Sequence, residues 1–286
     1  MSSHDGSKKA RRDAAREHAR ARREQEQKRR RRNRWFLQGG IGLAVIAVAA
    51  IVVVVVANSV HPAGPGPKNM ASDGVLLKGT DSSITAVRTK AIKAGGTPTP
   101  TKQASGVANI TIYEDYLCPF CNQFETTNIS QIKEWVKNGS ATLEIHPFAL
   151  LDRSSAGSNY SSRATNAAAC VANYQPDKFL AVNSAFYAKQ PSEGTKGLSD
   201  SEIVSLVKSA GVTNSAVPSC ITSGKFRPWV AAATERTLND KIPNSSVDKL
   251  TGTPLVIVNG KQYPSSTGSA LTSASEFAAF VQSATQ

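Results

Sequence analysis

Outside its first 34 residues the chain carries little net charge, and it contains no internal repeat. Residues 1–34 hold 14 of the 34 Lys and Arg but only 5 of the 21 Asp and Glu, a net charge of +9, while the rest of the chain is at +4. The high pI therefore does not indicate a nucleic-acid-binding face on the whole molecule. The content of Leu, Ile and Val excludes a chain that is disordered throughout.

Charge is entirely missing from residues 35–57, a run of 23 residues. As a helix this run would span about 34 Å, so we predict a transmembrane helix. Basic residues from Lys28 to Arg34 abut one end, and the first charge beyond the other end is Lys68. The positive-inside rule then places the N-terminus in the cytoplasm and the rest outside, a single-pass protein of the cell membrane. A cleaved signal peptide is the main alternative, although the charged lead and apolar run are longer than signal regions.

The segments around this helix have simple expected roles. Residues 1–34 are predicted to be a solvated cytoplasmic tail that touches anionic lipid, and nucleic-acid binding is the less favoured alternative because membrane orientation alone accounts for the charges. Residues 58–74 include the Pro- and Gly-rich run His61–Pro67 and are predicted to be a spacer. An extracytoplasmic domain is expected over 75–286, with edge strands from 75–108.

Cysteine and histidine are scarce, with four of each in 286 residues. The cysteines all lie on the predicted exported side, where disulfides persist: Cys118, Cys121, Cys170 and Cys220. A structural zinc site takes four ligands, usually from two closely spaced pairs. Here the last two cysteines are 50 residues apart, and only His61 and His146 lie on the same side. We therefore expect no metal and no bound cofactor, and interpret the first two cysteines as a redox pair.

The redox pair, Cys118-Pro119-Phe120-Cys121, is placed where a strand turns into a helix. Residues 109–115 are β-rich, and residues 122–137 carry apolar side chains at helical spacing. Unpaired N–H groups and the dipole at a helix start favour an anion, so we predict a lowered pKa for Cys118. Pro119 suits the first helical position. Cys118 would then exchange with disulfides, and Cys121 would resolve the mixed disulfide.

A second motif lies far downstream, over Thr251–Gly260. Pro254 opens a β-rich run that ends in an Asn-Gly pair typical of a hairpin turn. Taken alone, Pro254 could be an ordinary proline at a strand start. The order of strand, CxxC helix and Thr-Pro-strand-hairpin resembles the thioredoxin superfamily. That resemblance implies a cis Thr253–Pro254 bond that faces the CxxC and presents the backbone of Thr253 to an extended substrate chain.

About 100 residues separate a predicted strand at 142–148 from Pro254. They read as helices over 156–174, 176–189, 200–210 and 216–239, the third with a capping box from Ser199 and Glu202. The predicted fold is therefore α/β, thioredoxin-like, with a helical insertion over about 152–245. Together with Tyr113-Glu-Asp-Tyr-Leu-Cys-Pro-Phe-Cys121, this insertion resembles the DsbA-like thiol-disulfide oxidoreductases, and more narrowly the membrane-anchored ones of actinobacteria, over residues 108–286.

Two positions depart from that family's pattern. Well-studied members have His in the third place of the CxxC, where it stabilises the thiolate, whereas Phe120 has no side-chain N–H and leaves the oxidising strength open. Many superfamily members place a buried carboxylate six residues before the first Cys, and here that residue is Ile112. Strand alternation puts Glu114 on the same face, closer to the active-site end. Glu114 is therefore a candidate to relay the proton of Cys121, and the alternative is an exposed acid at a strand end.

The remaining cysteines and His146 are not expected to take part in catalysis. Cys170 and Cys220 both fall in the helical insertion, where a structural disulfide is expected and two free buried thiols are the alternative. His146 precedes Pro147 and is predicted to be a strand-end residue; the alternative, a catalytic base, is less favoured because exchange at a CxxC needs no histidine partner.

Three functions stay open. The first is an anchored oxidase that makes disulfides in reduced, unfolded exported proteins and, by resemblance, is reoxidised by a membrane partner of DsbB or vitamin K epoxide reductase type. The second is a reductase or isomerase of the cell envelope, since direction follows from reduction potential. The third is a non-catalytic docking domain, which the presence of both Cys118 and Cys121 argues against. No nucleic-acid partner is expected.

Overall fold

The computed structural model describes residues 64–80, 83–264 and 268–286. The predicted tail over 1–34, the predicted transmembrane helix over 35–57 and the start of the predicted spacer lie outside these ranges. Within them, no helix combines the length and the apolar character that a membrane crossing requires.

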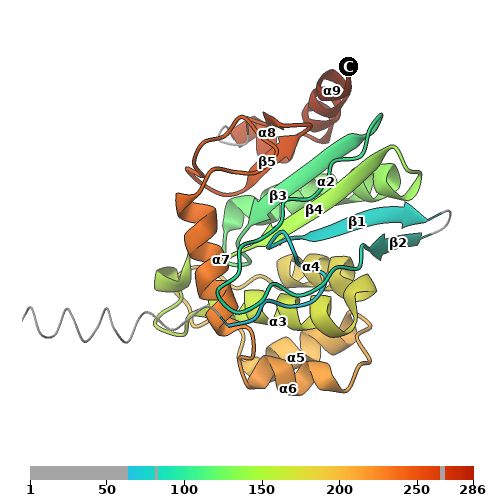
Figure 1. Cartoon of the computed structure of the whole chain (residues 1–286). Coiled ribbons are helices and arrows are strands. Elements are labelled where there is room, and N and C mark those ends of the chain that lie inside the picture. Colours follow the sequence, from blue (N-terminus) through green and yellow to red (C-terminus); the bar gives the residue numbers. More distant parts are fainter. Residues whose placement is uncertain (1–63, 81–82, 265–267) are drawn as a thin grey trace, which may run out of the picture. The chain divides into compact units, whose positions relative to one another are not determined.

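A six-stranded mixed sheet forms the centre of the domain, in the order β2-β1-β4-β3-β5-β6 (Figure 1). The strands are β1 Val75–Thr80, β2 Ser83–Ala86, β3 Ala108–Glu114, β4 Ala141–Pro147, β5 Leu255–Val258 and β6 Lys261–Gln262. The central strands β3 and β4 run parallel, and each pairs antiparallel with its outer neighbour. Every residue of β4 and all but one of β3 are buried, as expected for strands covered on both faces. Of the two strands formed by residues 75–108 at this side of the sheet, β2 lies at the edge as predicted, whereas β1 is paired on both sides, with β2 and β4.

Helices cover the sheet and form the predicted insertion (Figure 1). They are α2 Pro119–Lys137, α3 Tyr160–Tyr174, α4 Phe179–Ala188, α5 Asp200–Ser209, α6 Ala216–Thr222, α7 Arg227–Asn239, α8 Gly268–Thr272 and α9 Ala274–Thr285, with 3-10 turns η1 Asp152–Ser154 and η2 Pro176–Lys178. Helix α2 packs on β4 and contacts α4 of the insertion, and α3 packs against α4, α5, α6 and α7. The α/β, thioredoxin-like prediction is confirmed for the described residues.

Two of the predicted helices have different limits in the structure. The helix expected over 216–239 is two helices, because Gly224 adopts a left-handed φ of 64° after α6 and Pro228 falls in the first turn of α7. The helix expected from residue 156 begins at Tyr160, because Ala156, Gly157 and Asn159 all have positive φ. The capping box of Ser199 and Glu202 at the start of α5 is confirmed.

Residues 66–74, predicted as part of a spacer, pack on the domain instead. Met70 is fully buried, and the side chain of Asn69 donates a hydrogen bond to the carbonyl of Ala172 at 2.7 Å. The carboxylate of Asp73 accepts from Trp229 Nε1 at 3.0 Å and from Arg236 Nε at 2.7 Å. The spacer prediction is therefore wrong in its second half. Pro and Gly indicate that a segment is not helical, but they do not decide whether an extended chain packs against a neighbour.

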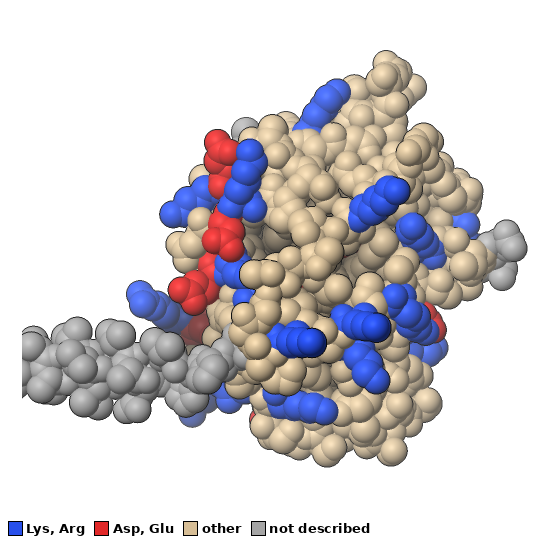
Figure 2. Space-filling view, in the orientation of Figure 1, with Lys and Arg blue, Asp and Glu red and all other residues tan. Residues whose placement is uncertain are grey.

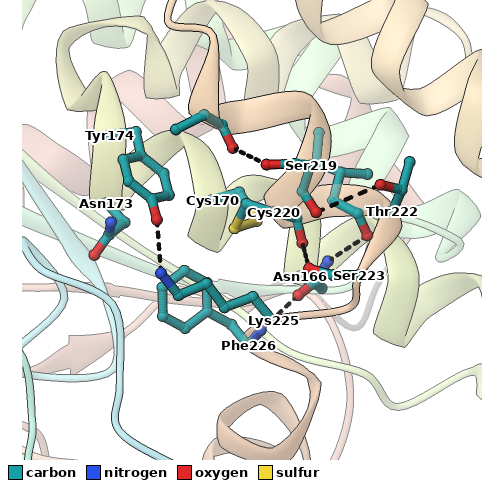
Figure 3. The surroundings of a disulfide bond; sticks show 12 residues. Asn166, Cys170, Asn173, Tyr174, Ser219, Cys220, Thr222, Ser223, Lys225 and Phe226 are labelled. Carbon is teal, nitrogen blue, oxygen red and sulfur yellow. Dashed lines mark hydrogen bonds between the residues drawn. A yellow bond between two sulfur atoms is a disulfide. The ribbon is translucent and has the colours of Figure 1, made fainter.

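A disulfide between Cys170 of α3 and Cys220 of α6 ties the insertion together (Figure 3). Beside it, Lys225 Nζ donates to the hydroxyl of Tyr174 at 2.6 Å, and the N–H of Phe226 donates to Asn166 Oδ1 at 2.8 Å. The disulfide confirms the predicted pairing, and the alternative of two free thiols is wrong. It closes a loop of 50 residues, which in the chain-entropy description stabilises the fold by about 4 kcal/mol.

Candidate functional site

The CxxC forms the turn between β3 and α2, as predicted. Cys118 is the N-cap residue of α2, and Pro119 lies in the first turn. The buried side chain of Asp115 holds the turn: it accepts from the N–H of Leu117 at 2.7 Å and from Ser161 Oγ at 2.7 Å, and it also bonds the N–H of Leu151 at 2.8 Å. Burial raises the pKa of Asp115 to about 6 despite these donors. Through Asp115, the turn is thus held by contacts with α3 and with the loop after β4.

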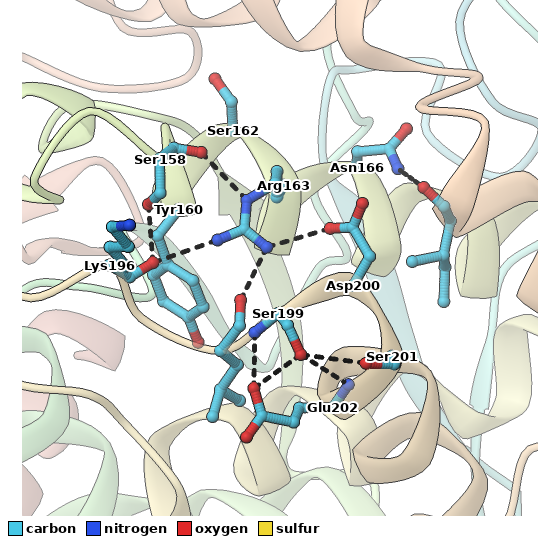
Figure 4. A network of polar contacts seen from close by, with 12 residues as sticks. Ser158, Tyr160, Ser162, Arg163, Asn166, Lys196, Ser199, Asp200, Ser201 and Glu202 are labelled. Atoms are coloured by element: carbon cyan, nitrogen blue, oxygen red, sulfur yellow. Dashed lines mark hydrogen bonds and ion pairs between the residues drawn. The ribbon is translucent and has the colours of Figure 1, made fainter.

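Gln190, just beyond α4, fixes the same turn from the insertion. Its side-chain N–H groups donate to the carbonyls of Tyr116 and Cys118 at 3.1 and 3.0 Å, and its oxygen accepts from Asn122 Nδ2 of α2 at 3.0 Å. The loop that follows is anchored by Arg163 of α3, which bonds the carbonyls of Ser158, Lys196 and Leu198 and the carboxylate of Asp200 (Figure 4). Sequence reasoning missed Gln190, because no local pattern marks it.

The nucleophile candidate, Cys118, lies against the loop that contains Pro254. The Thr253–Pro254 peptide bond is cis. The hydroxyl of Thr253 donates to Cys118 Sγ at 3.2 Å, and the Thr253 carbonyl lies 3.6 Å from the same sulfur. The CxxC and the cis-proline loop, 135 residues apart in sequence, therefore meet at one sulfur. The interpretation of Pro254 as an ordinary strand-start proline is wrong.

The two cysteines of the motif are both reduced and differ sharply in acidity. Hydrogen bonds from the Cys121 thiol, from the hydroxyl of Thr253 and from backbone N–H groups lower the pKa of Cys118 from 9.0 to about 7, against the effect of burial. The pKa of Cys121 is raised well above its ordinary value, first by burial and then by its hydrogen bond to Cys118. At neutral pH the dithiol therefore holds one partly ionised sulfur and one protonated, buried sulfur, the arrangement that thiol–disulfide exchange requires.

Glu114 is not an exposed strand-end acid: its exposed fraction is 1%. Burial raises the pKa of Glu114 well above its ordinary value, and the charge of Glu125 raises it further, although Asn183 and Tyr187 lie against the carboxylate and favour its charged form. The charge of Glu114 also contributes to the raised pKa of Cys121, after burial and the hydrogen bond between the two cysteines. The alternative of a solvent-exposed acid is therefore wrong.

A second buried acid, Glu125, was not singled out from the sequence. It lies on α2 four residues after Cys121, so both side chains share one face of the helix. Ser184 Oγ donates to Glu125 Oε1 at 3.1 Å, and Asn183 Nδ2 lies 3.5 Å from the same oxygen. Burial raises the pKa of Glu125 to about 7. The i, i+4 spacing from Cys121 was the signal that could have found it.

The remaining predicted residues lie at the surface or away from the cysteines. Phe120 is 56% exposed and is the one large apolar side chain that the described part of the chain leaves open to solvent. His146 is buried on β4, 3.4 Å from Glu144 and stacked on Tyr113. Because Tyr113 and Glu114 are consecutive in β3, His146 lies on the opposite face of the sheet from Glu114.

Several acidic residues of the domain are buried, and the others lie at the surface. Five carboxylates are buried among the described residues, namely Asp73, Glu114, Asp115, Glu125 and Glu144. On the face drawn in Figure 2, acidic side chains gather along one side beside basic ones, and Lys and Arg are distributed over the rest. In the described residues, His, Cys, Asp and Glu nowhere form a group of three or more that could hold a metal ion.

Comparison with known proteins gives three findings. The sequence profile described as thioredoxin matches residues 103–281. Two solved structures from Mycobacterium tuberculosis are similar: the reduced disulfide bond oxidoreductase DsbG, with TM-score 0.51 and 29% identity, and oxidised DsbA, with TM-score 0.53 and 28% identity. Each likeness covers 74% of this chain and 92% of the other. The serine/threonine-protein kinase PknE of M. tuberculosis is 32% identical over 119 residues, which are 40% of this chain and 21% of the kinase, so the match spans about a fifth of that relative.

Proposed function

The chain belongs to the thioredoxin family and is DsbA-like within it, and from this premise we propose that it is a membrane-anchored oxidase that introduces disulfides into exported proteins. The observation that carries exchange at the CxxC, in either direction, is the pair formed by Cys118, with a pKa of about 7, and the buried Cys121 with a raised pKa. The oxidising direction is supported by the structural disulfide between Cys170 and Cys220, which suits an oxidising compartment. A leaving thiol of lowered pKa departs more easily, which favours transfer of the disulfide to a substrate.

The reaction at this pair has two exchange steps. A substrate thiolate attacks Sγ of Cys118, the bond between the two enzyme sulfurs breaks, and Cys121 leaves with the electron pair and takes up a proton. A second substrate thiolate then attacks the substrate sulfur of the mixed disulfide, and Cys118 leaves as a thiolate. Two electrons pass from the substrate to the enzyme. We propose that Glu114 supplies the proton that Cys121 takes up.

The substrate is proposed to be an unfolded, reduced polypeptide. The backbone of Thr253 lies beside Cys118 and can hold an extended chain by β-augmentation. The exposed Phe120 offers an apolar contact next to the reacting sulfur. The contact with the Thr253 backbone is independent of substrate sequence, which suits a general oxidase, and the contact with Phe120 requires only an apolar side chain.

The proposed location is the outer side of the cell membrane, with residues 35–57 as the anchor and the N-terminus in the cytoplasm. The disulfide between Cys170 and Cys220 supports an oxidising compartment. The reduced dithiol would be reoxidised there by a membrane partner of DsbB or vitamin K epoxide reductase type.

A reductase or isomerase is the second candidate, and two observations favour it. The third place of the CxxC is Phe120, without a side-chain N–H. The pKa of Cys118 is about 7, close to the value of about 7 in reducing thioredoxin and above the value of about 3.5 in oxidising DsbA.

Equilibration of the full chain with glutathione separates the two candidates. A potential near about −120 to −180 mV supports the oxidase, whereas one near about −270 mV supports the reductase. Oxidative refolding of a reduced substrate and reduction of insulin, each repeated with Cys118→Ser, provide the companion assays. Activity that survives Cys118→Ser would contradict both enzyme candidates.

A further inference from the structure

Basic side chains of the domain gather on four segments around residue 64, the first residue that the structure describes. The segments are 64–68, 88–93, 173–178 and 222–228, and together they hold seven Lys or Arg and a single acid, Asp177. Their net charge is +6. The other residues of 35–286 hold 13 Lys and Arg and 15 Asp and Glu, a net charge of −2. The positive charge of the domain is therefore concentrated in one region.

The first three of these segments are joined by polar contacts. The N–H of Gly66 donates to the carbonyl of Ile92 at 2.9 Å, which pairs the first segment with the second. Arg88 of the second segment binds the carboxylate of Asp177, in the third, at 2.6 Å. This ion pair also neutralises the one acid of the four segments.

The third segment, at the end of α3, contacts the first and the fourth. The N–H of Lys68 donates to Asn173 Oδ1 at 3.0 Å. Lys225 Nζ donates to the hydroxyl of Tyr174 at 2.6 Å (Figure 3). The four segments thus form one continuous surface, which we call the basic face. Six of its seven basic side chains are exposed, namely Lys68, Arg88, Lys90, Lys93, Lys225 and Arg227.

The basic face lies where the chain arrives from the proposed membrane anchor. A Cβ on Gly64 would lie 3.3 Å from Cβ of Pro228, so the chain enters the domain beside the fourth segment. The proposed anchor ends at residue 57, and the chain from there to Gly64 reaches at most about 25 Å when fully extended. An anchored domain therefore keeps this entry point, and the basic face around it, close to the membrane.

We infer that the basic face binds the head groups of anionic phospholipids in the membrane that holds the anchor. The inference rests on the anchor of the proposed function. Lys and Arg bind phosphate through charge-assisted hydrogen bonds, and each basic residue near an anionic membrane strengthens binding about fivefold. Tyr174, half-buried on this face, belongs to a residue type that is enriched at membrane–water interfaces.

This mode of binding leaves the CxxC open to substrates. Helix α3 begins beside the CxxC turn, where Ser161 donates to Asp115, and ends at Tyr174 on the basic face. Its 15 residues make a helix about 22 Å long. The CxxC turn and the basic face therefore lie at opposite ends of α3. A domain bound to lipid through the basic face presents Cys118 to exported chains and not to the bilayer.

The test measures acetylation rates of individual lysines in the full chain by peptide mass spectrometry. The chain is placed in nanodiscs of neutral phosphatidylcholine, or of phosphatidylcholine mixed with anionic phosphatidylglycerol. Lys68, Lys90 and Lys93 are expected to react about fivefold more slowly, or slower still, in the anionic discs. In 1 M NaCl they are expected to regain the rates of the neutral discs, because the screening length falls to about 3 Å.

Lysines outside the four segments are the internal control. Lys189 precedes Gln190, which bonds the CxxC turn, and Lys249 and Lys261 lie near the cis-proline loop and in β6. All three are exposed. They are expected to react at the same rate in both kinds of disc.

Charge removal then tests the face itself. The triple variant Lys90→Gln, Lys93→Gln, Arg227→Gln alters exposed side chains only. It is expected to make Lys68 react at nearly the same rate in both kinds of disc, because three charges of about fivefold each are lost.

A matched triple variant, Lys189→Gln, Lys249→Gln, Lys261→Gln, removes the same charge elsewhere and is expected to keep the slow acetylation of Lys68. Loss of the slowing in this variant too would overturn the inference, because net charge alone would then explain the effect. Equal rates at Lys68 in the two discs for the wild type would also overturn it, and that is the result expected of a surface for an acidic protein.

The proposed function and this inference fail in different ways. A full chain that enters neither kind of disc would contradict the proposed anchor and, with it, this inference. Equal acetylation rates in a chain that has entered both would contradict the inference alone.

Discussion

The hydroxyl of Thr253 donates a hydrogen bond to Sγ of Cys118 at 3.2 Å, across 135 residues of sequence. The side chain of Thr253, next to the cis-proline, thus stabilises the reactive thiolate. The backbone of the same residue lies beside the sulfur, where we propose that a substrate chain binds. One residue therefore links acidity and substrate contact.

Thr253→Val is expected to raise the pKa of Cys118 from about 7 by about one pH unit, because a hydrogen bond to a charged group contributes about 1.5–3 kcal/mol. The thiolate absorbance near 240 nm, followed against pH, measures this change. Thr251→Val, an exposed site in the same loop, is the matched control. A pKa that is the same in both variants would show that the hydroxyl does not act on the sulfur.

The stability of the reduced chain is expected to increase with pH between about 7 and 9. The pKa of Cys118 is lowered on folding from 9.0 to about 7, so the folded state loses the proton first. The stabilisation is absent below pH 7, complete above pH 9 and amounts to about 3 kcal/mol. Urea unfolding of reduced wild type and reduced Cys118→Ser measures it as a difference. Parallel pH profiles for the two chains would contradict the lowered pKa.

Replacing the structural disulfide is expected to weaken the fold and spare the chemistry. The double variant Cys170→Ser, Cys220→Ser should lose about 4 kcal/mol of unfolding free energy, because the unfolded chain regains the conformational entropy that the disulfide had removed by closing the loop. Denaturant unfolding measures the loss, and alkylation of Cys118 at matched temperature serves as the control. A stability loss below about 1 kcal/mol would show that the helices hold the insertion without the bond.

Phe120→His is expected to make the enzyme more oxidising. An imidazole N–H beside Cys118 would favour the thiolate, lower its pKa and stabilise the reduced form. Each 1.4 kcal/mol of such stabilisation raises the reduction potential by about 30 mV. The glutathione equilibrium measures the potential, and Phe120→Leu, which keeps an apolar side chain, is the control. Equal potentials in the two variants would exclude the third CxxC residue as the determinant of redox direction.

Local patterns in the sequence were sufficient for the elements that carry the chemistry. A strand, a Cys at an N-cap and a Pro in the first turn follow from propensities that act within a few residues, and so does the Asn259-Gly260 turn. The break at Gly224 was also local, and we missed it because the apolar spacing continues across it. The spacer was misjudged because packing of residues 66–74 depends on partners in α3 and α7.

The sequence by itself determined the CxxC and its helix, since both depend on residue types whose geometry is fixed locally. For the Thr-Pro loop and for the Cys170–Cys220 pair it gave expectations with open alternatives, which the packing of distant segments decided. Only the tertiary structure decided that Glu114 is buried, that Glu125 lies beside it, and that Gln190 holds the turn. The pKa of a carboxyl depends on which side chains and how much water surround it. Those neighbours come from α2, β3 and α4, and their meeting is a property of the packed fold.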